Sequence, residues 1–166
     1  MSIHNHATSS TPNTNTRLFS IVGTVSIAGS ATVTGSGTSF LNELKVGDRI
    51  TIGSETRRIT AISNNTSLTV NEAFAATATG QVASYIPSEF DGGARVVSIK
   101  ASNINTGSVF IGMSQNTAKD GADVTSTTRV WRLAPGEVMP PFTCADPSIL
   151  YDQSDVATQR YNIIVN

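Results

Sequence analysis

The amino-acid sequence predicts an all-β protein built from two antiparallel modules. Short apolar stretches alternate with Thr and Ser and are separated by Gly, Asn and Asp at close intervals, which is typical of small antiparallel sheets. The 22 Thr and 20 Ser make up about a quarter of the 166 residues, a composition that favours strands because β-branched side chains pack well on a pleated surface. Residues 87–93, rich in Pro and Gly, divide the chain, since both residue types interrupt regular structure.

Residues 1–17 are expected to form an arm that is disordered or bound to a partner. They are almost all Ser, Thr, Asn, His and Pro, and Ile3 is the only large aliphatic residue after the first Met. Such a segment buries too little apolar surface to offset the entropy lost on ordering. Two hypotheses remain open: a flexible end, or an arm that orders against a neighbouring subunit.

The first module, residues 18–86, is predicted to be a small SH3-like β-barrel of about five short strands with one helical turn. A bend or bulge is expected at Gly23, inside the first strand. Gly53-Ser54 predicts a tight hairpin, because Gly supplies the positive φ that such turns need. Residues 74–80 are expected to be an Ala-rich link. The other expected strands cover residues 31–34, 49–52, 55–62, 67–70 and 81–85.

The helical turn of this module is expected to follow Ser39. A Ser at this position can accept a hydrogen bond from the first backbone N–H groups of a helix. Phe40, Leu41 and Leu44 would then lie on one face and fill the end of the barrel.

The second module, residues 94–166, is predicted to be an antiparallel, jelly-roll-like β-sandwich of about six strands. Pro140 and Pro141 mark residues 138–142 as an edge segment, because Pro donates no ladder hydrogen bond. The strand expected at residues 160–165 ends on the apolar Ile163, Ile164 and Val165, which predicts that the end of the sequence is held in a sheet. The other expected strands cover residues 95–100, 108–113, 129–133 and 148–151.

Composition disfavours several classes of protein. The net charge of −1 shows no electrostatic footprint for nucleic acid, and no apolar run approaches the roughly 20 residues of a membrane helix. No secretory signal is recognised at the start. A single cysteine, Cys144, excludes an internal disulfide framework and fits assembly in a reducing cytoplasm; it is expected to be a buried side chain rather than a nucleophile.

The protein is expected not to be an enzyme, in part because of where its histidines lie. His4 and His6 both lie in the polar arm, and no other His occurs, which excludes Ser-His-Asp and Cys-His sites from the folded part. Two His ligands on a flexible segment make a weak metal site, so a solvated tail is favoured. We expect no catalytic residue, no cofactor and no functional metal.

Acidic residues fall at predicted turns and strand ends. A carbohydrate-active enzyme, kept as a third hypothesis, would need two of them paired in a cleft, whereas turn chemistry explains each one separately. The pairs Asp120 with Asp123 and Asp152 with Asp155 could donate oxygens to calcium, but neither follows the spacing of an EF-hand loop, and ordinary turns are favoured. The other acids assigned to turns are Asp48, Glu55, Glu72, Glu89, Asp91 and Glu137.

One aromatic residue, Trp131, has two interpretations. It lies between Val130 and Arg132 in a predicted strand and is expected to belong to the core, since aromatic strand residues usually serve packing. The alternative is a binding face, because Trp and Arg are enriched at interface hot spots.

Parts of both modules carry a resemblance to a known family. Residues 23–40 read GTVSIAGSATVTGSGTSF, and a Val46-Gly47-Asp48 turn with an Ile-Thr-Ile strand follows. Residues 23–80 thereby resemble a module found repeatedly in virion proteins of tailed bacteriophages. Residues 105–112 and 132–137 are similar to the β-sandwich of phage structural proteins. Arg57-Arg58 departs from the pattern, where an apolar or aromatic residue is expected.

The resemblance implies a non-enzymatic capsid decoration, or cement, protein on the virion surface, assembled in the host cytoplasm. Such a protein covers joints between subunits of the major capsid protein and is expected to be a homo-oligomer, a trimer, without nucleic-acid or membrane partners. The residues expected to contact partners are Arg17, Leu18, Pro140, Pro141 and Phe142.

The alternative places the same fold in the phage tail, as a fibre, adaptor or baseplate component with a receptor- or glycan-binding face. This hypothesis predicts exposed aromatic residues beside polar loops, with Tyr85, Tyr151 and Tyr161 as candidates.

Overall fold

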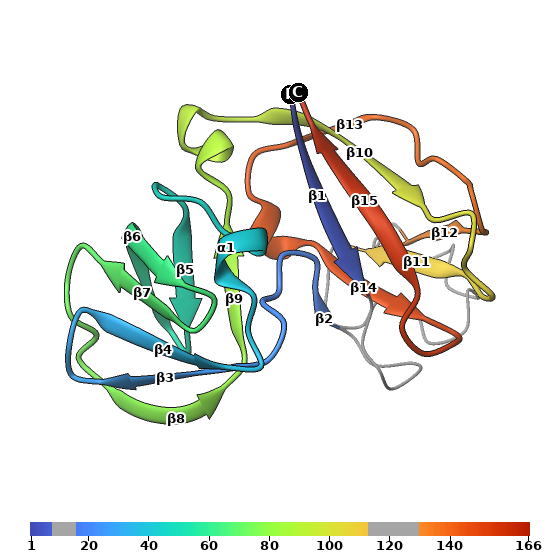
Figure 1. The fold of residues 1–166 in the computed structure, drawn as a ribbon. Helices are drawn as coiled ribbons and strands as arrows, with labels where there is room; N and C mark the ends of the chain where they lie inside the picture. Colours follow the sequence, from blue (N-terminus) through green and yellow to red (C-terminus); the bar gives the residue numbers. More distant parts are fainter. Residues whose placement is uncertain (8–15, 113–129) are drawn as a thin grey trace. The chain divides into compact units, whose positions relative to one another are not determined.

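The computed structural model describes residues 1–7, 16–112 and 130–166, and in this part of the chain all paired strands are antiparallel (Figure 1). The prediction of an all-β protein is confirmed. The chain forms two compact units: unit 1 combines Met1–Leu18 with Gly92–Asn166, and unit 2 is Phe19–Asp91. Leu18, expected in the first module, therefore belongs with the second half of the chain. The acidic pair Asp120 and Asp123 lies outside the described residues.

Unit 2 is built on one seven-stranded sheet that curls on itself (Figure 1). The order of its strands is β8-β3-β4-β7-β6-β5-β9. The short α1 follows β4, and the 3-10 helix η1 follows β9. Their bounds are β3 (Thr24–Ala28), β4 (Thr32–Ser36), α1 (Phe40–Glu43), β5 (Arg49–Ile52), β6 (Glu55–Asn64), β7 (Ser67–Val70), β8 (Thr77–Gln81), β9 (Ala83–Ile86) and η1 (Ser88–Gly92).

The bend expected at Gly23 is a change of partner strand. Before it, residues 19–21 pair with β9: Tyr85 N–H donates to the Phe19 carbonyl at 2.8 Å, and Ile21 N–H donates to the Ala83 carbonyl at 2.9 Å. After it, β3 pairs with β4 and β8. Gly23 has a φ of 81°, which lets the chain turn between the two partners.

The expected link at residues 74–80 instead contains most of β8, which pairs with β3 through a bulge between Val25 and Ile27. Phe74, 1% exposed, anchors the segment in the core. Ala and Gly are depleted in strands, so the composition of this segment gave no strand pattern. Backbone pairing with β3 decides its conformation.

Helix α1 receives its cap from another part of the chain. Ser39 makes no capping hydrogen bond through its side chain, which corrects the expectation. Asn65 takes over, because its carbonyl accepts from Phe40 N–H at 3.2 Å and its Oδ1 accepts from Leu41 N–H at 3.1 Å. Phe40 and Leu44 are buried as expected, whereas Leu41 is 58% exposed and does not join the core.

Unit 1 contains two four-stranded sheets in its described part, ordered β1-β15-β10-β13 and β12-β11-β14-β2 (Figure 1). The alternating burial of β15, with Tyr161, Ile163 and Val165 inside, places the core on one face of the first sheet. The bounds are β1 (Ser2–Ala7), β2 (Thr16–Arg17), β10 (Arg95–Ala101), β11 (Val109–Gly112), β12 (Val130–Leu133), β13 (Phe142–Cys144), the 3-10 helix η2 (Pro147–Ile149), β14 (Tyr151–Ser154) and β15 (Arg160–Val165).

The start of the chain is an edge strand in this structure, unlike the arm expected at residues 1–17. Strand β1 pairs with β15 over its whole length, from Ser2 opposite Val165 to Ala7 opposite Arg160 (Figure 1). Main-chain hydrogen bonds to β15 hold this polar segment, so it needs little apolar burial of its own. Within the described residues, β1 therefore pairs with a strand of its own chain, β15, rather than with a neighbouring subunit.

The strand expected at residues 148–151 begins later, at Tyr151. Pro147 starts the 3-10 helix η2, and the Asp146 carboxylate accepts from Ser148 N–H at 2.9 Å. This local cap outcompetes the extended conformation that the apolar Ile149 and Leu150 suggested.

Replacing Gly23 by Ala is expected to destabilise unit 2 by about 2 kcal/mol or more, because the positive φ alone costs a residue with a Cβ about 1–2 kcal/mol. The added Cβ would also meet the Ser36 carbonyl oxygen and lie 2.6 Å from the Gly37 carbonyl carbon. Urea denaturation measures the loss. Gly29→Ala is the matched control: its φ is 64°, but nothing lies within 4 Å of its added Cβ. Equal losses in both variants would contradict the steric argument.

Candidate functional site

The two expected partner residues at the root of the N-terminal segment have structural roles in unit 1. Leu18 is fully buried; its N–H donates to the Leu150 carbonyl at 2.8 Å, and its carbonyl accepts from the Tyr161 hydroxyl. Arg17 is half-buried, and its guanidinium lies over the Tyr151 ring, 5.9 Å from the centroid. Leu18 therefore presents no side-chain surface to a partner in this fold, which corrects its expected role.

The other expected partner residues, Pro140, Pro141 and Phe142, lie at an exposed edge of unit 1. Together with the neighbouring Val138 and Trp131, we call them the proline edge. Val138 is 55% exposed, and both prolines are exposed. Phe142 and Trp131 are half-buried and stack with their ring centroids 5.8 Å apart. They come from β13 and β12, which are edge strands of the two sheets, so the aromatic pair links these two edges.

Backbone pairing fixes the proline edge against β10. Met139, fully buried, donates from its N–H to the Ile99 carbonyl at 2.8 Å, and Ala101 N–H donates to the Glu137 carbonyl at 2.9 Å. Pro140 and Pro141 have no N–H to offer a further strand. A partner at this position must therefore dock by side-chain packing rather than by adding a strand.

Trp131 has features of both interpretations, a core residue and a residue of a binding face. It lies opposite the buried Ile111, so it shares the core face of its sheet, in agreement with the favoured core interpretation. Because β12 is an edge strand, the ring remains half-exposed beside Phe142. The same residue thus closes the core and offers aromatic surface.

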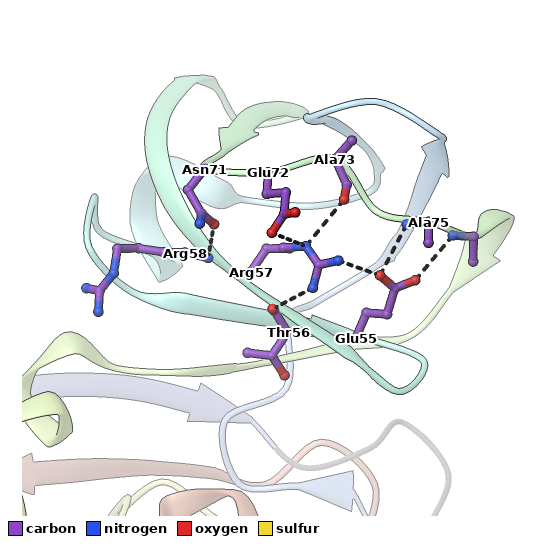
Figure 2. A network of polar contacts seen from close by, with 9 residues as sticks. Glu55, Thr56, Arg57, Arg58, Asn71, Glu72, Ala73 and Ala75 are labelled. Atoms are coloured by element: carbon purple, nitrogen blue, oxygen red, sulfur yellow. Dashed lines mark hydrogen bonds and ion pairs between the residues drawn. The ribbon is translucent and has the colours of Figure 1, made fainter.

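In unit 2, Arg57 and Arg58 stand where an apolar or aromatic residue is expected, and they belong to a polar network (Figure 2). The Arg57 guanidinium lies over the Phe74 ring, 5.4 Å from its centroid, and donates to the Glu55 carboxylate at 2.6 Å and to the Ala73 carbonyl at 3.3 Å. Arg57 thus covers an apolar ring as an aliphatic or aromatic residue would, while its charge is paired. Glu72 adds a longer ion pair at 3.9 Å.

The carboxylate of Glu55 holds the segment before β8 in place. It accepts from the N–H groups of Ala75 at 3.1 Å and Ala76 at 3.2 Å (Figure 2). These two bonds, together with the Arg57 charge, lower the pKa of Glu55 below its usual value of 4.5. Glu55 was expected to be a solvated turn residue; it is instead a clamp between the β5–β6 hairpin and the segment before β8.

Two further acids of unit 2 also have specific structural partners. Asp48, 1% exposed, accepts from Lys45 N–H and Ser88 N–H, both at 2.8 Å, while burial raises its pKa. Asp91 pairs with Arg49 at 3.1 Å and Arg58 at 2.8 Å. These contacts fasten η1, in the region expected to be a linker, to β5 and β6.

The histidines are part of unit 1, which corrects the expectation of a solvated tail. His4 is 7% exposed, and the half-buried His6 stacks on Tyr161 at 5.7 Å between ring centroids. Burial and the neighbouring His4 lower the pKa of His6 to about 4, so its imidazole is neutral at pH 7. No group of three His, Cys, Asp or Glu side chains in the described residues could hold a metal ion.

The acids Asp152 and Asp155 and the thiol of Cys144 also have structural rather than chemical roles. Asp155 Oδ1 accepts from Ser108 N–H at 2.7 Å, and Asp152 is buried in β14, so these acids do not form an open calcium loop. Cys144 is buried, and burial raises the pKa of its thiol, which disfavours the reactive thiolate.

Comparison with known proteins yields no relative. No protein-family model matches the chain, and no curated protein or solved structure matches it. No helix in the described residues is long and apolar enough to cross a membrane.

Replacing Glu55 by Gln is expected to reduce stability at pH 7 but to have a smaller effect in acid. Because the pKa of Glu55 is lowered in the folded state, its contribution is fully present above pH 4.5 and is lost as the pH falls through the folded-state pKa. Chemical denaturation from pH 7 to about pH 3 should show the difference from wild type shrinking. Glu72→Gln is the control, since it changes a charge near Arg57 but leaves the Ala75 and Ala76 bonds intact. A difference independent of pH would contradict the assignment.

Proposed function

We propose that this protein is a non-enzymatic structural protein of a tailed-bacteriophage particle: a capsid decoration protein that binds across joints of the major capsid protein and stabilises the head. The phage-like pattern of residues 23–80 supports the class of protein. The proline edge is the observation that carries the docking role.

The proposal includes a finer description of the fold. Unit 2 is an SH3-like barrel, supported by its curled seven-stranded sheet. Unit 1 is a jelly-roll-like sandwich, supported by its two four-stranded sheets and by the stacked Trp131 and Phe142 at their edges. Both modules would act as rigid bodies that present surfaces, with no chemical step.

The proline edge suits an interface for three physical reasons. Pro and Phe are stiff, so burying them costs little side-chain entropy. Val138, Pro140 and Pro141 place apolar surface in solvent, where a partner can bury it. The stacked Trp131 and Phe142 supply the aromatic surface that is enriched at the centres of interfaces.

A protein that decorates a shell would gain from acting as a homo-oligomer. A homo-oligomer, which we propose to be a trimer, would present one proline edge per copy and gain affinity through simultaneous attachment. Arg17, at the edge strand β2, is retained as a secondary contact residue, and Leu18 is not. The protein would join the capsid surface during assembly in the host cytoplasm.

A location in the tail, as a fibre, adaptor or baseplate component, is the alternative outcome. Its expected aromatic face is overturned in part, because Tyr85 and Tyr161 are 2% and 1% exposed. Tyr151 remains half-buried beneath Arg17. The tyrosines thus provide no shared exposed face for this alternative.

Replacing the exposed Pro141 by Asp is expected to weaken binding to empty, expanded capsids by about tenfold or more, because it places a charge in an apolar contact. Co-sedimentation with purified heads and with tails of the same lysate measures the effect. Deletion of residues 1–17 is a poor test, since it removes β1 and β2 from their sheets.

Pro135→Asp is the matched control for this experiment, because Pro135 is also an exposed proline of unit 1 but lies in the turn before the edge segment. It should bind heads within about twofold of wild type. Equal losses in both variants would reject the proline edge as the docking surface. Saturable binding to tails and none to heads would overturn the decoration role.

A further inference from the structure

A polar groove of about 580 Å³ lies on unit 1, where β10 ends and β15 begins. It is formed by the first strand, by the loop after β10 and by the outer face of the sheet. Its lining residues are Asn5, His6, Lys100, Ala101, Ser102, Asn103, Ile104, Arg160 and Asn162.

Strand register places three polar side chains in a row across the groove. Asn5 lies opposite Asn162, and Asn162 lies opposite Lys100, on the adjacent strands β1, β15 and β10. Neighbouring strands are about 4.8 Å apart, so the row spans about 10 Å. All three residues are exposed, and Arg160, two positions before Asn162, continues the same face.

Hydrogen bonds fix the loop that borders this row. Asn105 Nδ2 donates to the Arg160 carbonyl at 2.8 Å, and Arg160 N–H donates to Asn105 Oδ1 at 2.8 Å. Ser102 N–H donates to the same carbonyl at 2.9 Å. Ile104 is thereby presented at the rim with 74% of its surface exposed. A ligand would lose little free energy in ordering a loop that is already held by these bonds.

The charge of the groove is positive. No carboxylate lines it, and neither Lys100 nor Arg160 forms an ion pair within the described residues. His6 adds no charge at pH 7, because its pKa is lowered to about 4. Among the described residues the two cations therefore have no neutralising partner, which favours an anionic ligand.

The amide side chains restrict the ligand further. Asn5, Asn103 and Asn162 each carry two N–H donors and a carbonyl acceptor. A sugar hydroxyl both donates and accepts, so it can use both ends of an amide, whereas a carboxylate or phosphate only accepts. The groove therefore combines groups suited to hydroxyls with groups suited to a carboxylate. Ile104 offers an apolar surface to the C–H face of a sugar ring.

We propose that this groove binds an acidic oligosaccharide, with its carboxylates facing Lys100 and Arg160 and its hydroxyls paired with the asparagine amides. The assignment goes beyond a structural role in the particle and does not depend on it, since the ligand is a saccharide rather than a capsid subunit. It adds recognition of an anionic glycan to a chain that otherwise serves as a rigid module.

The test is an NMR titration of the full-length protein with a trimer of galacturonic acid. We expect saturable binding at or below about 1 mM, with shifts at Asn103, Ile104 and Asn162, and weaker binding as NaCl rises from about 0.05 M to about 0.5 M. Two further probes are a neutral glucose trimer and a hepta-glutamate peptide. Both should bind at least about fivefold more weakly than the acidic trimer.

Lys100→Ala and Arg160→Ala should each weaken binding of the acidic trimer about fivefold to tenfold. Arg95→Ala is the matched control: it also removes one cation from unit 1, but from the opposite end of β10, and should bind like wild type. Absence of saturable binding in the folded wild-type protein would overturn the proposal. Binding of the peptide as tight as that of the acidic trimer would also overturn it and would identify an acidic protein segment as the ligand.

Discussion

The fold depends on supplying acceptors to backbone N–H groups in the connections between short strands. An N–H that is buried without an acceptor costs about as much as a lost hydrogen bond, and strands of four to six residues leave many such groups outside the ladders. The side chains of Asp48, Glu55 and Gln159 each accept from two backbone N–H groups, and each joins segments that are distant in sequence. Asn65 accepts from two N–H groups of α1, one through its backbone carbonyl and one through its side chain. The polar residues that interrupt the apolar pattern therefore hold the connections together.

Strands were predictable where burial alternates along a single segment. β5 and β15 have the expected bounds, β5 from the alternation of Ile with polar residues and β15 from its apolar end, and in both strands every second residue is buried. β1 and β8 were not predictable, because neither has an apolar period and each is held by a partner strand, β15 and β3 respectively. The pattern of one segment carries no information about which distant backbone will supply its hydrogen bonds. For the same reason, the sequence did not show that Leu41 is exposed while Phe40 and Leu44 are buried.

The candidate surfaces were predictable only where the chemistry of a single residue type indicates its position in a sheet. Pro140 and Pro141 indicate an edge because proline lacks an N–H, and the structure places them beside an edge strand. Leu18 looked like the end of a polar arm, and only the two sheets of unit 1 reveal that it belongs to the core. The row of Asn5, Asn162 and Lys100 required the register of three strands that are far apart in the sequence. Long-range register is absent from any single stretch of sequence.

The division of unit 1 between both ends of the sequence has a consequence for how the chain folds during synthesis. Unit 2 is continuous, so all its strands are available once Asp91 has left the ribosome. Strand β1 is made before unit 2 and pairs with β15, which is made after it, so that contact must close over all the residues of unit 2. The two units therefore become complete in the order opposite to that in which their first strands are made. A growing chain can therefore carry a complete unit 2 while β1 still lacks the β15 strand with which it pairs.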